Sequence, residues 1–180
     1  GYRFVEFPIY NFAQAFLYQQ IGKLTLEQWG RVVTIFSSLI SIIFLYLLVK
    51  KYTSIRTGLF AAFFFAFVPY SIYYSRVILP DQSMVAALLG GTYFFSNWIE
   101  RPKFSILNLQ FLLALILIAC ALLLKPYALF FSLPLIYLAW HRFGFGLFKK
   151  WQLWLFLILA ALPLGLWHEW MSQREFIQGV

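Results

Sequence analysis

The sequence is poor in cysteine, in charged residues and in the short motifs that mark soluble enzymes. Its one cysteine, Cys120, excludes an intrachain disulfide and a cysteine-based metal cluster. It contains no glycine-rich phosphate loop, no His-x-x-x-His metal pair and no Gly-x-Ser-x-Gly nucleophile turn. Charged residues make up only 11% of the chain, whereas about 25% is usual for a soluble domain. These deficits argue against a soluble metalloenzyme, nucleotide-binding enzyme or serine hydrolase.

What the chain has in excess is apolar surface. Hydrophobic residues account for 63% of its 180 residues, and 22 phenylalanines and 7 tryptophans are among them. A water-soluble fold of this length cannot bury so much apolar surface, whereas these aromatic residues suit lipid-facing surfaces and interfacial belts. The net charge of +8 does not indicate a nucleic-acid partner, because the basic residues punctuate the apolar runs. The composition therefore predicts an all-α, polytopic transmembrane helix bundle with about six spanning helices.

Six apolar runs approach the length of about 20 residues that a membrane-spanning helix needs. They cover residues 32–49, 59–78, 81–99, 106–124, 127–140 and 151–170. Lys125 and Pro126 separate the fourth run from the fifth, because proline breaks or kinks a helix. Residues 8–21 are too short and too polar to span, and they predict a helix at the interface or packed on the bundle. Gly90 and Gly91 predict a close approach by another helix.

The charged residues between the runs predict the orientation. Paired cations, Lys50-Lys51 and Lys149-Lys150, follow the first and fifth runs, and this side carries more Lys and Arg than the other. The positive-inside rule therefore predicts that this side is cytoplasmic, in a multi-pass protein of the inner or plasma membrane. The rule gives acids little role, so it does not explain an excess of acids on the other side. A functional site on the extracytoplasmic face would explain that excess, and we predict one there. Five of the six acidic residues fall there: Glu6, Glu27, Asp81, Glu169 and Glu175.

The turn between the second and third runs holds two candidate site residues, Asp81 and Arg76. An ionisable residue at the membrane boundary is a site candidate by default, but capping of the next helix explains Asp81 equally well. Arg76 lies at the extracytoplasmic end of the second run, where it either joins a site or extends toward the lipid headgroups. Together they place an acid and a cation at one mouth of the bundle.

Three further ionisable residues fall at the same mouth. Lys125 closes the fourth run, where its ammonium is able to hold a phosphate or to anchor the helix end at the interface. Glu6 precedes the interfacial segment, and His168 closes the sixth run. An ordinary loop or a solvated helix end is the alternative explanation for these last two residues.

Four short motifs occur in order along the chain. They are Glu6-Phe7-Pro8-Ile9-Tyr10, Gly30-Arg31-Val32-Val33, Pro69-Tyr70-Ser71-Ile72-Tyr73-Tyr74-Ser75-Arg76 with Leu79-Pro80-Asp81, and Leu124-Lys125-Pro126. Their order and spacing resemble polytopic glycosyltransferases of the GT-C fold. The third motif is the most specific, and it resembles a helix–helix turn of the dolichyl-phosphate-mannose–protein mannosyltransferase and aminoarabinose transferase-like group.

The resemblance implies an enzyme that takes a sugar from a polyprenyl-phosphate carrier on the extracytoplasmic face and passes it to a protein, lipid or glycan. It implies that Glu6 and Asp81 are catalytic: they would orient the acceptor, assist acid–base chemistry or bind a divalent metal. Arg76 and Lys125 would bind the donor phosphate, because cations at a partly desolvated membrane mouth stabilise the charge of a leaving phosphate. The further candidates are Tyr10, Arg31, Tyr74 and His168.

The resemblance also implies that residues 1–180 form part of a longer transmembrane domain. The family's first exterior loop, with an acidic general base, would precede Gly1, and a C-terminal part would follow Val180, so the piece alone is expected to be inactive. Two other classes stay open. A transporter or lipid flippase would carry ionisable residues near the bilayer midplane, and in a non-catalytic assembly subunit the exterior charges would diverge in space.

Overall fold

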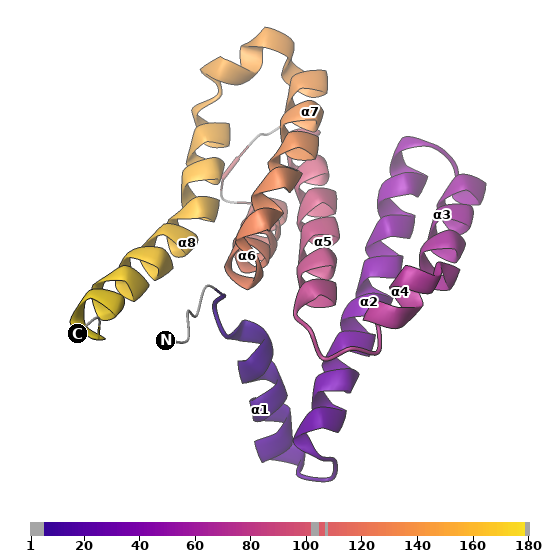
Figure 1. The fold of residues 1–180 in the computed structure, drawn as a ribbon. Helices are drawn as coiled ribbons and strands as arrows, with labels where there is room; N and C mark the ends of the chain where they lie inside the picture. The colour runs from indigo at the N-terminus through magenta and orange to yellow at the C-terminus, as the bar shows by residue number, and fades with distance from the viewer. Residues whose placement is uncertain (1–5, 102–104, 107, 179–180) are drawn as a thin grey trace.

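The computed structural model describes residues 6–101, 105–106 and 108–178, and of residues 174–178 it describes the backbone alone. The predicted extracytoplasmic acid Glu175 therefore has its side chain outside the described part. Helices joined by short turns make up the structure, and successive long segments run in alternating directions (Figure 1). The elements are α1 (Ile9–Ile21), α2 (Leu26–Tyr52), α3 (Ile55–Phe67), α4 (Pro69–Tyr74), α5 (Asp81–Ile99), α6 (Leu109–Leu124), η1 (Pro126–Phe131), α7 (Ser132–Phe143), η2 (Gly144–Lys149) and α8 (Trp151–Gln178).

The prediction of an all-α bundle is confirmed, and each of the six apolar runs falls on helix. Residues 59–78 differ from the single helix that the sequence predicts, because α3 ends at Phe67, α4 covers Pro69–Tyr74, and residues 75–78 follow α4 outside any helix. Val68 separates the two with an extended backbone at φ −62° and ψ 129°. Proline lacks the N–H that would continue the helix, and it disfavours helical backbone in the residue before it, so Pro69 begins a new helix instead.

The length and exposed surface of the helices indicate a membrane protein. In the described part of the chain, three helical segments are long and apolar enough to cross a membrane: Leu26–Tyr52, Pro126–Lys149 and Trp151–Gln173. The helices α3 and α6 are apolar but shorter, so fewer segments reach spanning length than the six predicted crossings. Many large apolar residues are exposed, among them Phe130 at 76% and Phe145 at 79%. Lipid, rather than water, is the solvent that suits such a surface.

The packing centre lies between α5 and α6. Leu88, Trp98 and Ala114 are almost completely buried there. A Cβ atom added to Gly91 would lie 2.6 Å from Ile118 Cδ1, and one added to Gly90 would lie 2.9 Å from Phe44. These distances leave no room for a side chain, so the predicted close approach at the two glycines is confirmed.

The N-terminal helix α1 packs on α2. Tyr10 is 5% exposed, and its O–H donates to Gly30 O at 2.7 Å and lies 2.8 Å from Thr34 Oγ1. Gln14 Nε2 donates to Leu26 O at 2.8 Å. The second of the two predicted placements, a helix packed on the bundle, therefore describes α1.

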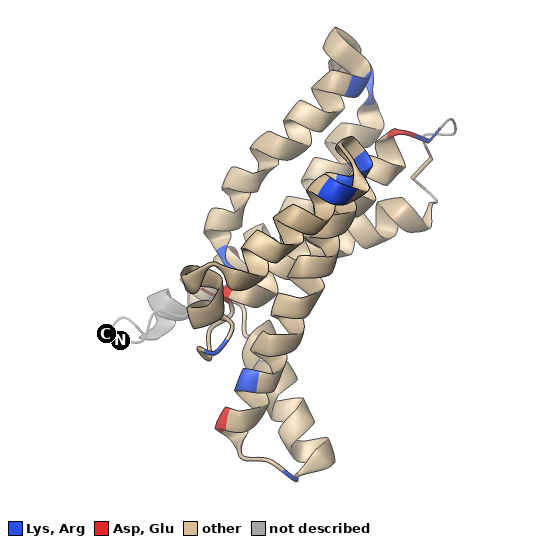
Figure 2. Cartoon of the chain, turned by 90° about the vertical axis from the view of Figure 1, so that its right-hand side faces the viewer, with Lys and Arg blue, Asp and Glu red and all other residues tan. Residues whose placement is uncertain are grey.

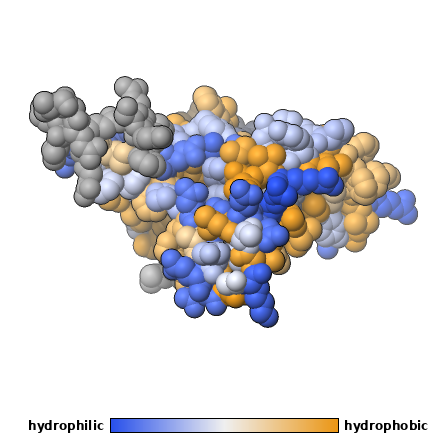
Figure 3. Space-filling view, turned by 60° about the horizontal axis from the view of Figure 1, so that its bottom comes forward, coloured by the Kyte–Doolittle hydropathy of each residue, from blue (hydrophilic) through white to orange (hydrophobic). Residues whose placement is uncertain are grey.

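Charged residues gather at the two ends of the bundle (Figure 2). We call the end with α1, residues 75–80 and Lys125 the α1 end, and the end with Lys50-Lys51 and Lys149-Lys150 the opposite end (Figure 1). At the opposite end, Lys51 Nζ lies 2.9 Å from Glu100 Oε2 and donates to Ser96 Oγ at 2.7 Å. The α1 end presents hydrophilic side chains among hydrophobic ones (Figure 3).

Candidate functional site

Three charged side chains from separate parts of the sequence meet at the α1 end. Lys125 Nζ lies 2.7 Å from Glu6 Oε1 and 3.7 Å from Asp81 Oδ2. The lysine side chain is 17% exposed, that of Asp81 26% and that of Glu6 43%. We call these three residues the charge triad. It is partly desolvated yet still accessible, as a site that must admit a substrate has to be.

A helix break places Lys125 in the triad. Lys125 follows α6 with an extended backbone at φ −148° and ψ 115°, and its N–H closes the helix on Ala121 O at 3.0 Å. Pro126 is the first residue of η1 and has no N–H to continue α6. The chain therefore turns at Lys125, which leaves its side chain at the mouth of the bundle.

Two contacts fix Glu6 beside the end of α6. The Phe7 N–H donates to Leu123 O at 3.0 Å. The Phe7 ring packs edge-on against Trp167 of α8, with centroids 4.6 Å apart. These contacts hold the segment between α6 and α8, so the residue before Phe7 reaches the ammonium of Lys125.

Asp81 is the first residue of α5, but its side chain does not cap that helix. Pro80 occupies the N-cap position, without a side-chain capping bond. The Asp81 carboxylate instead accepts the Tyr127 O–H at Oδ1, 2.6 Å away, and faces Lys125 with Oδ2. The helix N-terminus also favours a negative charge in its first turn. The capping alternative for Asp81 is therefore wrong.

Tyr127 belongs to this site, although no motif in the sequence singles it out. It is 48% exposed in η1, and besides its bond to Asp81 its ring centroid lies 5.9 Å from Lys125 Nζ. The one available signal was its place two residues after Lys125. With 11 tyrosines in the chain, that signal is weak.

The triad keeps its lysine charged. Burial by itself lowers the pKa of Lys125, but the hydrogen bond to Glu6 and the negative charges of Asp81 and Glu6 outweigh burial, so the pKa is raised above its usual value. Two carboxylates against one ammonium give the triad a formal charge of −1 when all three are ionised. Such a group suits orientation of a hydroxyl and acceptance of its proton.

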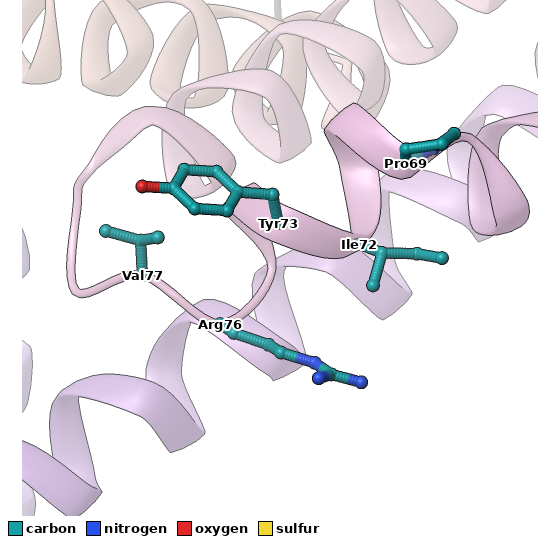
Figure 4. Close-up of a pocket in the computed structure, with 5 residues that line it drawn as sticks. All are labelled: Pro69, Ile72, Tyr73, Arg76 and Val77. Carbon is teal, nitrogen blue, oxygen red and sulfur yellow. The ribbon is translucent and has the colours of Figure 1, made fainter.

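Arg76 lies apart from the triad. Within the part of the chain that the structure describes, its exposed side chain makes no hydrogen bond or ion pair. It lines a hollow of about 520 Å³ together with four other residues (Figure 4). Their side chains come from α4 and the segment after it: Pro69, Ile72, Tyr73 and Val77. We call this space the α4 hollow.

The remaining candidates divide between packing and exposed positions. Tyr10 is buried and joins α1 to α2, which is a packing role. Tyr74 packs against Tyr70 with the rings tilted and their centroids 4.4 Å apart. Arg31 and His168 are exposed, and among the described residues neither forms an ion pair. The structure therefore brings Glu6, Asp81 and Lys125 together, and leaves the other candidates outside the triad.

The described residues offer two acids, rather than a larger donor set, as candidate metal ligands. Among them, no three or more His, Cys, Asp or Glu residues gather in one place. Glu6 and Asp81 flank the Lys125 ammonium, which already supplies a positive charge to both carboxylates. A divalent cation held by the same two acids would meet repulsion from that ammonium.

Comparison with protein families finds a match over most of the chain. The family model described as dolichyl-phosphate-mannose-protein mannosyltransferase matches residues 7–168 of the 180-residue chain. No curated protein and no solved structure matches. The matched span includes α1 to α7 and most of α8, and with them Asp81, Lys125 and Tyr127.

Proposed function

The chain belongs to the dolichyl-phosphate-mannose-protein mannosyltransferase family, and from this premise we propose an integral-membrane glycosyltransferase with a polyprenyl-phosphate-linked donor. It transfers the sugar to a hydroxyl of a protein, lipid or glycan. The reaction takes place on the extracytoplasmic face, at the α1 end of the bundle. The observation that carries the proposal is the convergence of Glu6, Asp81 and Lys125 at that end.

The triad residues suit the two tasks of the transfer. The acceptor oxygen bonds to the anomeric carbon while the bond from that carbon to the phosphate oxygen breaks, and the phosphate leaves with the electron pair. Lys125 stabilises the charge that develops on the phosphate, and Arg76 assists from the neighbouring hollow. The acceptor proton passes to a carboxylate, for which Glu6 and Asp81 are the candidates among the described residues.

The triad also gives the donor a route onto Lys125. An ammonium has three N–H donors. Lys125 holds Glu6 at 2.7 Å but Asp81 only at 3.7 Å. A phosphate therefore competes first with Asp81, and each acid that it displaces from Lys125 is free to face the acceptor hydroxyl. A divalent metal at Glu6 and Asp81 remains a prediction, and no step here depends on one.

The distribution of charge favours an enzyme over the two alternatives. A transporter or flippase needs ionisable residues near the bilayer midplane, whereas the charged residues here lie at the ends of the bundle (Figure 2). An assembly subunit has no need for its exterior charges to converge. Glu6 and Lys125 lie far apart in the sequence and still meet, with 2.7 Å between Lys125 Nζ and Glu6 Oε1.

The test is a transfer assay on the complete gene product in membrane vesicles. The vesicles receive a polyprenyl-phosphate-linked radiolabelled sugar and a mixed acceptor fraction. We expect label in the acceptor and release of the polyprenyl phosphate. An intact donor after prolonged incubation, with correctly inserted protein, overturns the proposal.

A further inference from the structure

The connection between α7 and α8 gathers cations without acids. It runs from the last turn of α7 through η2 to the start of α8 at the opposite end of the bundle, and we call residues 141–151 the α7–α8 turn (Figure 1). The sequence has no acidic residue between Glu100 and Glu169. Among the residues that the structure describes, no acid pairs with the cations of the turn. These exposed cations are Arg142, Lys149 and Lys150.

The lysine pair of the α2–α3 connection, at the same end, is different because one of its two charges is neutralised. Lys51 Nζ lies 2.9 Å from Glu100 Oε2, and its side chain is only 18% exposed. Lys150 instead faces an aromatic ring, with its Nζ 5.7 Å from the centroid of Phe143. The α7–α8 turn is therefore the place at this end where several described cations stay exposed and uncompensated.

Large aromatic residues lie among these cations. Phe145 is 79% exposed, and Phe148 and Trp151 are each 59% exposed. The turn connects Pro126–Lys149 with Trp151–Gln173, and both segments are long and apolar enough to cross a membrane. The turn is therefore expected at the membrane boundary, where aromatic residues meet acyl chains and cations meet headgroups.

The backbone holds the turn in a defined shape while leaving its outer side open. The Gly144 N–H closes α7 on Trp140 O, at a φ of +53° that favours glycine. The Trp140 ring packs edge-on against Phe145, with centroids 4.8 Å apart, and Trp154 Nε1 donates to Phe148 O at 3.2 Å. A Cβ atom added to Gly144 would still meet no neighbouring atom within 4 Å. A ligand therefore has access to a surface that is already formed.

We infer that the α7–α8 turn binds the headgroup of an anionic phospholipid. The Arg142 guanidinium and the two lysine ammoniums suit the oxygens of a phosphodiester, and Phe145 and Phe148 suit the acyl chains below it. A zwitterionic lipid fits less well, because its own cation meets the repulsion of the three protein cations. The positive-inside rule assigns this end to the cytoplasmic leaflet, whose anionic lipids attract basic segments next to spanning helices.

The exposed aromatic residues favour a lipid over a water-soluble polyanion. An acidic protein or a nucleic acid could pair with Lys149 and Lys150. It would, however, leave Phe145 and Phe148 against a polar surface, although both are more than half exposed. A phospholipid satisfies the cations and the aromatic rings with one molecule. The inference makes no use of the charge triad, so it is independent of the proposed function.

The first test titrates the complete gene product in detergent with phosphatidylglycerol and counts bound lipids by native mass spectrometry. We expect the wild type to retain phosphatidylglycerol in preference to phosphatidylcholine. Each cation beside an anionic lipid contributes about fivefold in affinity, so the double variant Lys149→Gln, Lys150→Gln should bind phosphatidylglycerol about tenfold or more weakly. The matched control, Lys50→Gln with Arg56→Gln, removes two exposed cations from the α2–α3 connection and should stay within about twofold of the wild type.

A second pair of variants tests the apolar half of the surface. Phe145→Ser with Phe148→Ser should also weaken phosphatidylglycerol binding. The control is Phe60→Ser with Phe64→Ser, at residues of α3 that are 65% and 64% exposed, and it should bind as the wild type does. A bound lipid stabilises the folded protein, so phosphatidylglycerol should raise the melting temperature of the wild type more than that of Lys149→Gln, Lys150→Gln. Without added lipid these two proteins should melt alike, which shows that the variant is folded.

Three results overturn the inference. Equal losses of phosphatidylglycerol in the lysine variant and its control would mean that only the overall charge of the protein matters. Equal retention of phosphatidylcholine by the wild type would remove the selectivity for an anionic headgroup. Displacement of phosphatidylglycerol by inorganic phosphate at equal concentration would mean that the cations bind a free anion and that the aromatic residues contribute nothing. None of these measurements uses sugar transfer, so each of them leaves the proposed function standing.

Discussion

Lys125 and Glu6 form an ion pair that has a close counterpart at the other end of the bundle. The Lys125 Nζ–Glu6 Oε1 distance is 2.7 Å, with side-chain exposures of 17% and 43%. Lys51 Nζ and Glu100 Oε2 are 2.9 Å apart, with exposures of 18% and 44%. Tyr52 donates to Glu100 as Tyr127 donates to Asp81. The two pairs have similar lengths and side-chain exposures, so the opposite end supplies a matched control for each test of the α1 end.

Replacing Lys125 with Met should lower sugar transfer by about 10²–10³-fold, because the leaving phosphate loses its cation. The measurement is initial transfer rate per folded protein in membrane vesicles. Lys51→Met removes an equally exposed lysine from the opposite end and should leave the rate within a few-fold of the wild type. Equal losses in the two variants would show that Lys125 matters only for stability.

The same comparison with the opposite end tests whether Glu6 and Asp81 have a functional role or only a structural one. Asp81→Asn and Glu6→Gln each keep the shape of the side chain and remove its charge. We expect each to reduce transfer strongly, by about tenfold or more, without loss of membrane expression. The control is Glu100→Gln, which breaks the Lys51 pair at the opposite end. Near-normal transfer by either variant removes that residue from the site.

Tyr127→Phe should lower kcat and leave KM for the donor nearly unchanged. The variant removes the O–H that fixes Asp81 Oδ1 at 2.6 Å, and a hydrogen bond to a charged group contributes about 1.5–3 kcal/mol. Loss of positioning at that level corresponds to a fall in rate of roughly ten- to a hundredfold. Tyr52→Phe removes the longer, 3.4 Å contact to Glu100 and is the control. A Tyr127→Phe enzyme with wild-type kcat would mean that Asp81 needs no such support.

Much of this site follows from the sequence because membrane helices fix where charges lie along the bilayer normal. Glu6, Asp81 and Lys125 each adjoin a helix end, and alternate helix ends come to the same level. The sequence does not fix their positions around the bundle. Arg76 shares that level but lies in the α4 hollow instead of the triad. Tyr127 was missed for a different reason, since nothing in composition separates one interfacial tyrosine from another.

In the fold, too, features that depend on neighbouring residues follow from the sequence, whereas features that depend on contacts between helices do not. The break at Pro69 is local, because the proline disfavours helical backbone at Val68, and the extended Val68 divides one run into two helices. The role of α1 is tertiary. Its sequence allows a helix on the lipid surface, whereas the bond from Tyr10 to Gly30 O places it against α2.

Tyr10→Phe tests whether the Tyr10 hydroxyl stabilises the packing of α1 against α2. The variant loses the bonds from Tyr10 to Gly30 O and Thr34, while Thr34 keeps its own bond to Gly30 O at 3.1 Å. We expect a cost of about 1 kcal/mol, or roughly 2–4 °C in the melting temperature in detergent. Transfer per folded molecule should not change. Tyr18→Phe, at a tyrosine that is 46% exposed, is the control, and an equal shift there would contradict a specific role for Tyr10.

The pKa of Lys125 gives the triad a defined dependence on pH. Burial opposes the charged form, but Glu6 and Asp81 outweigh it and raise the pKa. A lysine with a raised folded pKa contributes stability that is fully present below its unfolded value of about 10.4. That stability is lost only as the pH rises through the still higher folded value. The difference in melting temperature between wild type and Lys125→Met should therefore stay constant from pH 7 to pH 9. A difference that shrinks across this range would mean that the ammonium is already losing its proton, and a neutral amine could not hold the donor phosphate at physiological pH.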